Sequence, residues 1–76
     1  MGDIKISDIA ALGLKIRQSR KHQKLTQSEL SGIAGTGVRF ISDLENGKEN
    51  VHLGKMFSVL NALGLKLFLS DDWKNI

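Results

Sequence analysis

The sequence contains no cysteine, which excludes disulfide bonds and metal sites built from thiolates. It has only two histidines, His22 and His52, and they are too far apart in the chain to resemble a paired ligand motif. We interpret both as ordinary polar residues and expect neither a metal nor a cofactor. A cysteine-free chain is also at home in a reducing cytoplasm.

Long apolar runs are missing as well, because no stretch approaches the ~20 consecutive apolar residues of a membrane-spanning helix. The N-terminal residues MGDIKISD have neither the basic region nor the apolar region of a secretion signal. We therefore expect the protein in the cytoplasm. With 76 residues, the chain predicts a single domain, 1–76, that is too small for a catalytic cleft.

Patterns of catalytic chemistry are also absent from the sequence. No histidine accompanies a nucleophile, no carboxylates cluster at acid–base spacing, and no glycine-rich loop follows a strand pattern. We interpret Gly35-Thr36-Gly37 as a turn rather than a nucleotide site. The protein is therefore not expected to be an enzyme.

Positive charge is concentrated in one part of the chain, whose formal net charge is +3. The segment 15–24 carries no acidic residue but five basic ones: Lys15, Arg17, Arg20, Lys21 and Lys24. Such a run is typical either of a solvated helix face or of a surface that binds phosphate. Composition alone leaves both interpretations open.

Proline is absent, so helix boundaries are predicted from glycines and capping residues. Ser7 is a favourable N-cap for a first helix that runs to about residue 22. Thr26 and Glu29 have the spacing of a capping box, which predicts that a second helix begins at Gln27. Gly35 ends this helix. The residues expected to face inward from these two helices are Ile9, Leu12, Ile16, Leu30, Ile33 and Ala34.

A third helix is predicted over 37–46, with Ile41 and Leu44 as a narrow buried stripe and Gly47 at its end. Most of its other residues are polar, so its outer face has little to pack against. A fourth helix is predicted over 52–63, and Gly64 terminates it. Its expected apolar stripe is wide and consists of Leu53, Met56, Phe57, Leu60 and Leu63.

Residues 65–70 alternate in a pattern that predicts a β-strand. A lone strand needs a partner, which could be the N-terminal segment DIKIS or the same strand of a second subunit. The predicted fold is therefore mainly α-helical, with four to five helices and a short C-terminal strand that pairs in a dimer. The residues predicted to form the dimer strand are Leu65, Leu67, Phe68 and Leu69.

Two short helices joined by a tight glycine-containing turn, with a support helix after them, predict a helix-turn-helix over about 26–47. The second helix of such a unit projects one face from the body of the protein. An α-helix fits the major groove of B-DNA, where each base pair presents a distinct pattern of donors and acceptors. The free outer face of the third helix therefore indicates DNA recognition.

The stretch LTQSELSGIAGTGVRFISDLENGK resembles the helix-turn-helix of the Cro and phage-repressor (XRE) family. Together with VLNALGLKLFL, it is similar to the short HipB-like antitoxins over about residues 12–69. The resemblance implies a lambda-repressor-like bundle and a homodimer at the nucleoid that binds a pseudo-palindromic operator and represses its own operon. It also implies a second partner, a HipA-type kinase toxin.

The resemblance implies roles for individual residues. The positions that match phosphate contacts are Gln27, Asn46 and Lys48, and the base-facing positions are Gly37, Val38, Arg39, Ser42 and Asp43. The planar guanidinium of Arg39 can bond guanine O6 and N7 together. Asp43 would orient Arg39 or accept from cytosine. Because Gly37 and Val38 offer few hydrogen bonds, direct readout is expected to be sparse and DNA shape to contribute.

Arg20 and Glu45 match a pair that ties the first helix to the end of the third in phage repressors, so a partly buried ion pair is expected. Two alternatives to an antitoxin stay open. The protein could be a stand-alone regulator without a toxin. It could also be an interaction module that contacts a partner protein through Phe68 and the strand edge, with little DNA binding.

Overall fold

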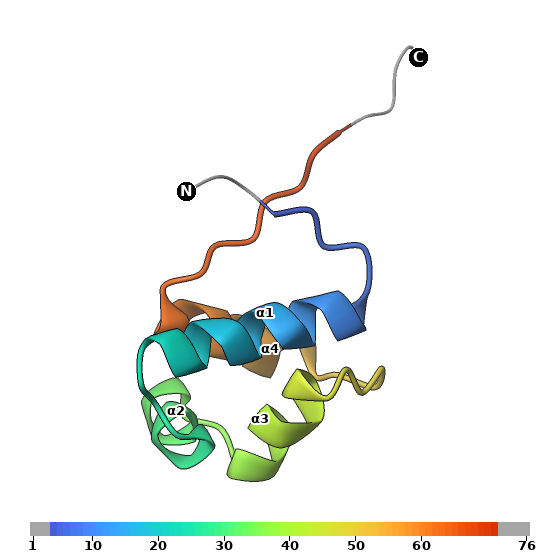
Figure 1. Cartoon of the computed structure of the whole chain (residues 1–76). Helices are drawn as coiled ribbons and strands as arrows, with labels where there is room; N and C mark the ends of the chain where they lie inside the picture. The colour runs from blue at the N-terminus through green and yellow to red at the C-terminus, as the bar shows by residue number, and fades with distance from the viewer. Residues whose placement is uncertain (1–3, 72–76) are drawn as a thin grey trace.

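The computed structural model describes residues 4–71 and contains four helices within that range (Figure 1). They are α1 (Ile9–His22), α2 (Gln27–Ala34), α3 (Val38–Glu45) and α4 (Leu53–Leu63). Helix α2 packs against α3 and α4, and α1 packs against α3 and α4. The mainly α-helical bundle expected from the sequence is thereby confirmed, with four helices rather than five.

The first two helices begin at different kinds of cap. Asp8, and not Ser7, caps α1, because its Oδ1 accepts from the N–H of Ala11 at 2.8 Å. The capping box of α2 is confirmed, since the N–H of Glu29 donates to Thr26 Oγ1 at 3.0 Å and the N–H of Thr26 donates to Glu29 Oε1 at 2.8 Å.

The hydrophobic core lies where the four helices meet. The side chains with no more than 1% exposure come from all of them: Ile16, Leu30, Ile41, Leu44 and Val59. The remaining buried apolar side chains are Leu12, Met56, Leu60 and Leu63. The expected buried stripe of α3, Ile41 and Leu44, is therefore confirmed.

Three residues expected in the core lie at the surface instead. Leu53 is 62% exposed and Phe57 is 42% exposed, because the side of α4 that turns inward is offset from them and contains Val59. Ile33 is 60% exposed near the end of α2. Periodicity identifies an apolar side of a helix, but the width of the covered stripe depends on which neighbours pack there.

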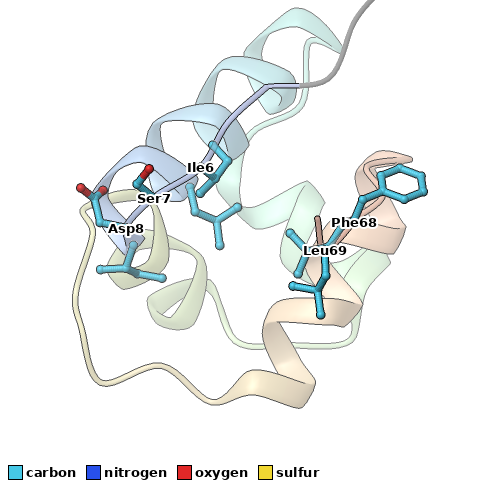
Figure 2. Close-up of a pocket in the computed structure, with 8 residues that line it drawn as sticks. Ile6, Ser7, Asp8, Phe68 and Leu69 are labelled. Carbon is cyan, nitrogen blue, oxygen red and sulfur yellow. The ribbon is translucent and has the colours of Figure 1, made fainter. Parts of the chain in front are cut away.

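The strand predicted over 65–70 is absent, and the described part of the chain contains no β-strand. The segment runs beside the N-terminal residues, and the two line an open pocket with Ile6, Asp8 and Leu69 on its walls (Figure 2). The described residues of these two segments form no ladder of backbone hydrogen bonds. A strand exists only when a neighbour satisfies its N–H and C=O groups, and residues 4–71 provide none here.

None of the helices within residues 4–71 combines the length and apolar character that crossing a bilayer requires. The same residues contain no group of three or more His, Asp or Glu side chains placed to hold a metal ion.

Candidate nucleic-acid interface

The turn between α2 and α3 sets the direction of α3. Gly35 ends α2 in the left-handed conformation, with φ of 73°, which glycine adopts at little steric cost. The N–H groups of Gly35 and Thr36 both donate hydrogen bonds to the carbonyl oxygen of Ser31. Gly37 then lies in extended conformation as the N-cap of α3. The chain reverses between Gly35 and Gly37, so α3 leaves α2 at a steep angle (Figure 1).

Helix α3 has one buried side and one side that faces solvent. Ile41 and Leu44 are at most 1% exposed and anchor the buried side in the core. Val38 is 45% exposed and Arg39 is exposed, so the first turn projects furthest from the bundle. Ser42 and Asp43 follow one turn later and are half-buried. The five base-facing candidates, Gly37, Val38, Arg39, Ser42 and Asp43, thus occupy the N-cap and the first two turns of one short helix.

Arg39 projects from α3 without an internal partner. Its guanidinium makes no hydrogen bond or ion pair with any residue between 4 and 71. Among the described residues no hydrogen bond or ion pair joins Asp43 to Arg39, and the Asp43 carboxylate lies 3.8 Å from Lys48 Nζ. The side chains of Lys48 and Asp43 are 57% and 38% exposed, so the contact is a loose surface ion pair worth at most ~1 kcal/mol. The donors of Arg39 are consequently available to a ligand.

A buried polar network holds the C-terminal end of α3 against α1 and α2. Arg20 Nε donates to Glu45 Oε2 at 2.6 Å, and Arg20 Nη2 donates to Glu45 Oε1 at 3.0 Å. Gln27 Nε2 also donates to Glu45 Oε1, at 3.1 Å. The side chains of Arg20 and Glu45 are only 9% and 3% exposed. The ion pair expected between Arg20 and Glu45 is therefore present, and it is bidentate.

The network shifts the pKa values of both charged partners. Burial acts to raise the pKa of Glu45, but hydrogen bonds from Arg20 and Gln27 and the charges of Arg20 and Arg17 outweigh it, so this pKa lies below its ordinary value. The hydrogen bond to Glu45 raises the pKa of Arg20 against the opposing effect of burial. Both groups are therefore charged at neutral pH.

Helix α1 packs so closely against the C-terminal end of α3 that there is no room for a side chain at two glycines. A Cβ atom on Gly13 would lie 2.3 Å from the carbonyl oxygen of Leu44, and one on Gly47 would lie 2.9 Å from Cα of Ala10. Gly47 also has φ of 74°, a conformation that glycine favours. These two close approaches leave α3 little freedom to move relative to α1.

The three candidate phosphate contacts lie at the two ends of the helix-turn-helix. Gln27 is the first residue of α2 and is half-buried. Its amide group carries two N–H donors, of which Glu45 uses one. Asn46 is the exposed C-cap of α3, and exposed Lys48 follows one residue after Gly47. Because Gln27 is bonded to Glu45, the last residue of α3, it lies at the same end of that helix as Asn46.

Sequence reasoning missed two features of this region. It did not identify the contact of Gly13 with α3, although a glycine inside an otherwise helical pattern signals a close packing partner. It also did not predict the hydrogen bond between Gln27 and Glu45. These residues are far apart in the sequence, and no local pattern links them.

Comparisons with known proteins agree with this geometry. A family model described as helix-turn-helix matches residues 16–69. The uncharacterized HTH-type transcriptional regulator y4mF of Sinorhizobium fredii (strain NBRC 101917 / NGR234) is 46% identical over 63 residues, which cover 83% of this chain and 83% of that protein.

Solved structures share the whole fold. A chain from the structure of a HipA-HipB-O2-O3 complex matches with a TM-score of 0.85 and 31% identity, over 93% of this chain and 100% of that one. A HipB-O4 20mer complex matches with a TM-score of 0.84, 31% identity and the same coverages. The restriction-modification controller protein C.AhdI from Aeromonas hydrophila matches with a TM-score of 0.69 and 25% identity, over 78% and 86% of the two chains.

The resemblance inferred from the sequence is thus confirmed at the level of family and fold. Because the family model spans most of the chain and the bundle agrees with the HipB structures, this chain belongs to the XRE-type helix-turn-helix family of transcriptional regulators.

Proposed function

We propose that the protein is a repressor that binds the operator of its own operon as a homodimer and serves as the antitoxin of a HipA-type kinase toxin. The main support for DNA binding comes from the first turn of α3. This turn presents to solvent the guanidinium of Arg39, which has no partner within residues 4–71, on a helix whose other end is held by hydrogen bonds from Arg20 and Gln27. A rigidly held helix with a free donor face suits the major groove of DNA.

In this proposal, Arg39 reads a guanine through its paired donors, which gives ~1–3 kcal/mol of discrimination against other bases. Exposed Val38 packs on a thymine methyl group, and Gly37 and Ser42 allow the helix to approach the base edges closely. Asp43 accepts from cytosine only after it separates from Lys48, so its contribution is smaller. Sequence-dependent DNA shape supplies the remaining specificity.

The phosphate contacts of the proposal are Gln27, Asn46 and Lys48. Gln27 uses its second amide N–H at the start of α2, where the backbone N–H groups of the helix also favour a phosphate. Asn46 and Lys48 hold the DNA backbone beyond the end of α3. Phosphate contacts fix the orientation of the protein without reading sequence. The contact of the cation Lys48 should weaken as salt increases, because a cation that neutralises a phosphate displaces counterions from the DNA.

A homodimer would place two recognition helices in successive major grooves of a pseudo-palindromic operator, with half-sites ~34 Å apart. The support for dimerisation is the apolar segment 65–69, in which Leu67, Phe68 and Leu69 are 45%, 72% and 97% exposed. Pairing of this segment with a second copy would satisfy its backbone groups and bury its side chains. The strand predicted from the sequence would then form only in the dimer.

The antitoxin role is supported by the likeness to chains from HipA-HipB-O2-O3 and HipB-O4 complexes. A HipA-like kinase would be the second protein partner, and the protein itself would perform no catalysis at the nucleoid. The alternatives are a regulator without a toxin and a module that binds a partner protein with little DNA binding. The exposed Phe68 favours protein contacts in general but does not select a toxin.

Fluorescence anisotropy with the DNA upstream of the protein's own gene, and with a scrambled duplex of equal length, tests the repressor proposal. We expect the unchanged protein to prefer the upstream DNA. Arg39→Ala should lose most of that preference, by a factor that corresponds to ~1–3 kcal/mol. Arg39→Lys is the matched control for charge, because it keeps the positive charge but loses the planar pair of donors.

Equal binding of both duplexes by the unchanged protein at every salt concentration would contradict the repressor and favour the interaction module. The antitoxin part is tested separately by size-exclusion chromatography of the protein mixed with a HipA-like kinase encoded beside it. Co-elution is the expected result, and separate elution at micromolar concentrations would leave a stand-alone regulator.

A further inference from the structure

The flank of α1 that faces the end of α3 carries the positive charge of Arg17, which lies outside the hydrogen-bonded network of Arg20, Gln27 and Glu45. Gly13 contacts the carbonyl groups of Leu44 and Glu45, and Arg20 bonds the carboxylate of Glu45. Arg17 lies four residues after Gly13 and three before Arg20, so it shares this side of the helix. Its charge accordingly acts on Glu45 and helps to lower the pKa of that carboxyl group.

Glu45 cannot neutralise both arginines. Its two oxygens already accept from Arg20 and Gln27, and the bidentate bond to Arg20 compensates its single negative charge. Arg17 is exposed, and its side chain makes neither a hydrogen bond nor an ion pair within the described residues. The cluster therefore keeps a net positive charge that is open to solvent.

This charge lies beside the start of α2, because Glu45 is bonded to Gln27. An anion held by the free amide donor of Gln27 would be attracted by the charge of Arg17, which already acts on the neighbouring Glu45. We propose that Arg17 is a further phosphate-binding residue, which grips the DNA backbone together with Gln27. The inference rests on the proposed binding of DNA and assigns one member of the basic segment 15–24 to it.

Two other basic residues of that segment differ from Arg17. Lys15 lies on the opposite flank of α1, where it lines a surface depression with Gln18, Ser19 and His22. Arg20 is buried in the network with Glu45. The basic segment thus divides into a side that faces α3 and a side that faces away from it, and Lys15 offers a matched control on the same helix.

The test compares Arg17→Gln with Lys15→Gln, each of which removes one positive charge from α1. Affinities for the upstream duplex and for a scrambled duplex are measured by anisotropy between 50 and 200 mM salt. We expect Arg17→Gln to weaken binding to both duplexes by the same factor, because a phosphate contact carries no sequence information. Its log–log salt slope should be smaller in magnitude by ~0.9 than that of the unchanged protein.

Arg17→Lys should retain the slope, since it keeps a cation at the phosphate. Circular dichroism spectra that match those of the unchanged protein confirm that the variants are folded, as expected for an exposed side chain without internal bonds. The same loss of affinity and the same slope for Arg17→Gln and Lys15→Gln would overturn the role of Arg17 while DNA binding stands. Failure of the unchanged protein to bind either duplex would overturn both proposals.

Discussion

At the scale of single residues, Glu45 connects the folding of this protein to its proposed binding surface. Its carboxylate accepts three hydrogen bonds, two from Arg20 and one from Gln27. Burial alone would raise its pKa, but these bonds and nearby positive charges lower the pKa below its ordinary value of 4.5. A carboxyl group with a lowered pKa stabilises the folded state above its unfolded-state pKa, and this contribution is lost as pH falls through the folded-state pKa.

We therefore expect the free energy of unfolding to decrease when the pH is lowered from 7 to 3. Glu45→Gln should reduce it at pH 7 by about 3 kcal/mol, because the charge of Arg20 is then buried without compensation. The difference between the variant and the unchanged protein should shrink below pH 4.5, where Glu45 is increasingly protonated in the unfolded state. Urea unfolding at a series of pH values measures this difference.

Exposed Glu49 provides the control for this series. Glu49→Gln should remain within ~0.5 kcal/mol of the unchanged protein, as is usual for a surface substitution. A difference between Glu45→Gln and the unchanged protein that stays constant from pH 7 to 3 would show that the charge of Glu45 is not what stabilises the fold.

At the scale of helices, α1 and α3 meet through a glycine. An exposed glycine inside a helix is ~1 kcal/mol less favourable than alanine, so its replacement by alanine usually stabilises the protein. Gly13 is buried, and an added Cβ would lie 2.3 Å from the carbonyl oxygen of Leu44. The two helices would have to separate to admit a methyl group, which would displace the end of α3 and its polar network.

Gly13→Ala is accordingly expected to lower the stability by ~1–3 kcal/mol, the usual effect of an overpacked contact. Gly32→Ala is the matched control, because Gly32 lies in α2 and its added Cβ would meet nothing within 4 Å. That substitution should stabilise by about 1 kcal/mol, which corresponds to ~4–8 °C in melting temperature for a chain of this size. Thermal unfolding followed by circular dichroism measures both changes, and a melting temperature raised by both substitutions would exclude the close contact.

At the scale of the whole molecule, the two ends of the described chain leave the helical bundle on the same side (Figure 1). They bring exposed apolar side chains there, among them Ile4 at 56% exposure and Leu69 at 97%. Contiguous apolar side chains at the surface mark an interaction site more often than a solvated face. This location agrees with a second copy docking at the termini while α3 stays free for DNA.

Sedimentation at micromolar concentration should give twice the chain mass of 8.4 kDa. Leu69→Lys should shift the protein to the monomer, because its side chain contributes nothing to the single-chain core but would be buried in the paired strand. Leu14→Lys is the control, since Leu14 is 57% exposed on α1 and lies outside the segment proposed to pair. If the unchanged protein sediments as a monomer, the dimer is disproved, but the proposal that α3 binds DNA is unaffected.

Local signals in the sequence account for most of the helical framework. The capping box of Thr26 and Glu29 and the left-handed Gly35 both depend on groups within a few residues of one another. Both ends of α2 could therefore be predicted correctly from the sequence. The cap of α1 was assigned to Ser7 instead of Asp8, because both residue types cap well and only the backbone conformation decides between neighbours.

Predictions that depended on distant neighbours were less accurate. Leu53 and Phe57 were placed in the core, yet the other helices cover the adjacent side of α4 that carries Val59. The strand over 65–70 was predicted from alternation alone, which cannot supply the backbone partner that a strand requires. For the candidate site, the resemblance supplied the positions of the base-facing residues, whereas the pairing of Asp43 with Lys48 depends on where the chain goes after Gly47.

The sequence by itself determined the four helices and the turn that separates α2 from α3, since capping, glycine turns and helical periodicity act over three or four residues. The family followed from the resemblance of the motif LTQSELSGIAGTGVRFISDLENGK to known helix-turn-helix regulators. Only the tertiary structure decided that Gln27 bonds Glu45, that Gly13 contacts the backbone of α3 and that Arg17 lies beside this network. These contacts join residues distant in the chain, and their geometry depends on how the helices pack against one another rather than on any local pattern.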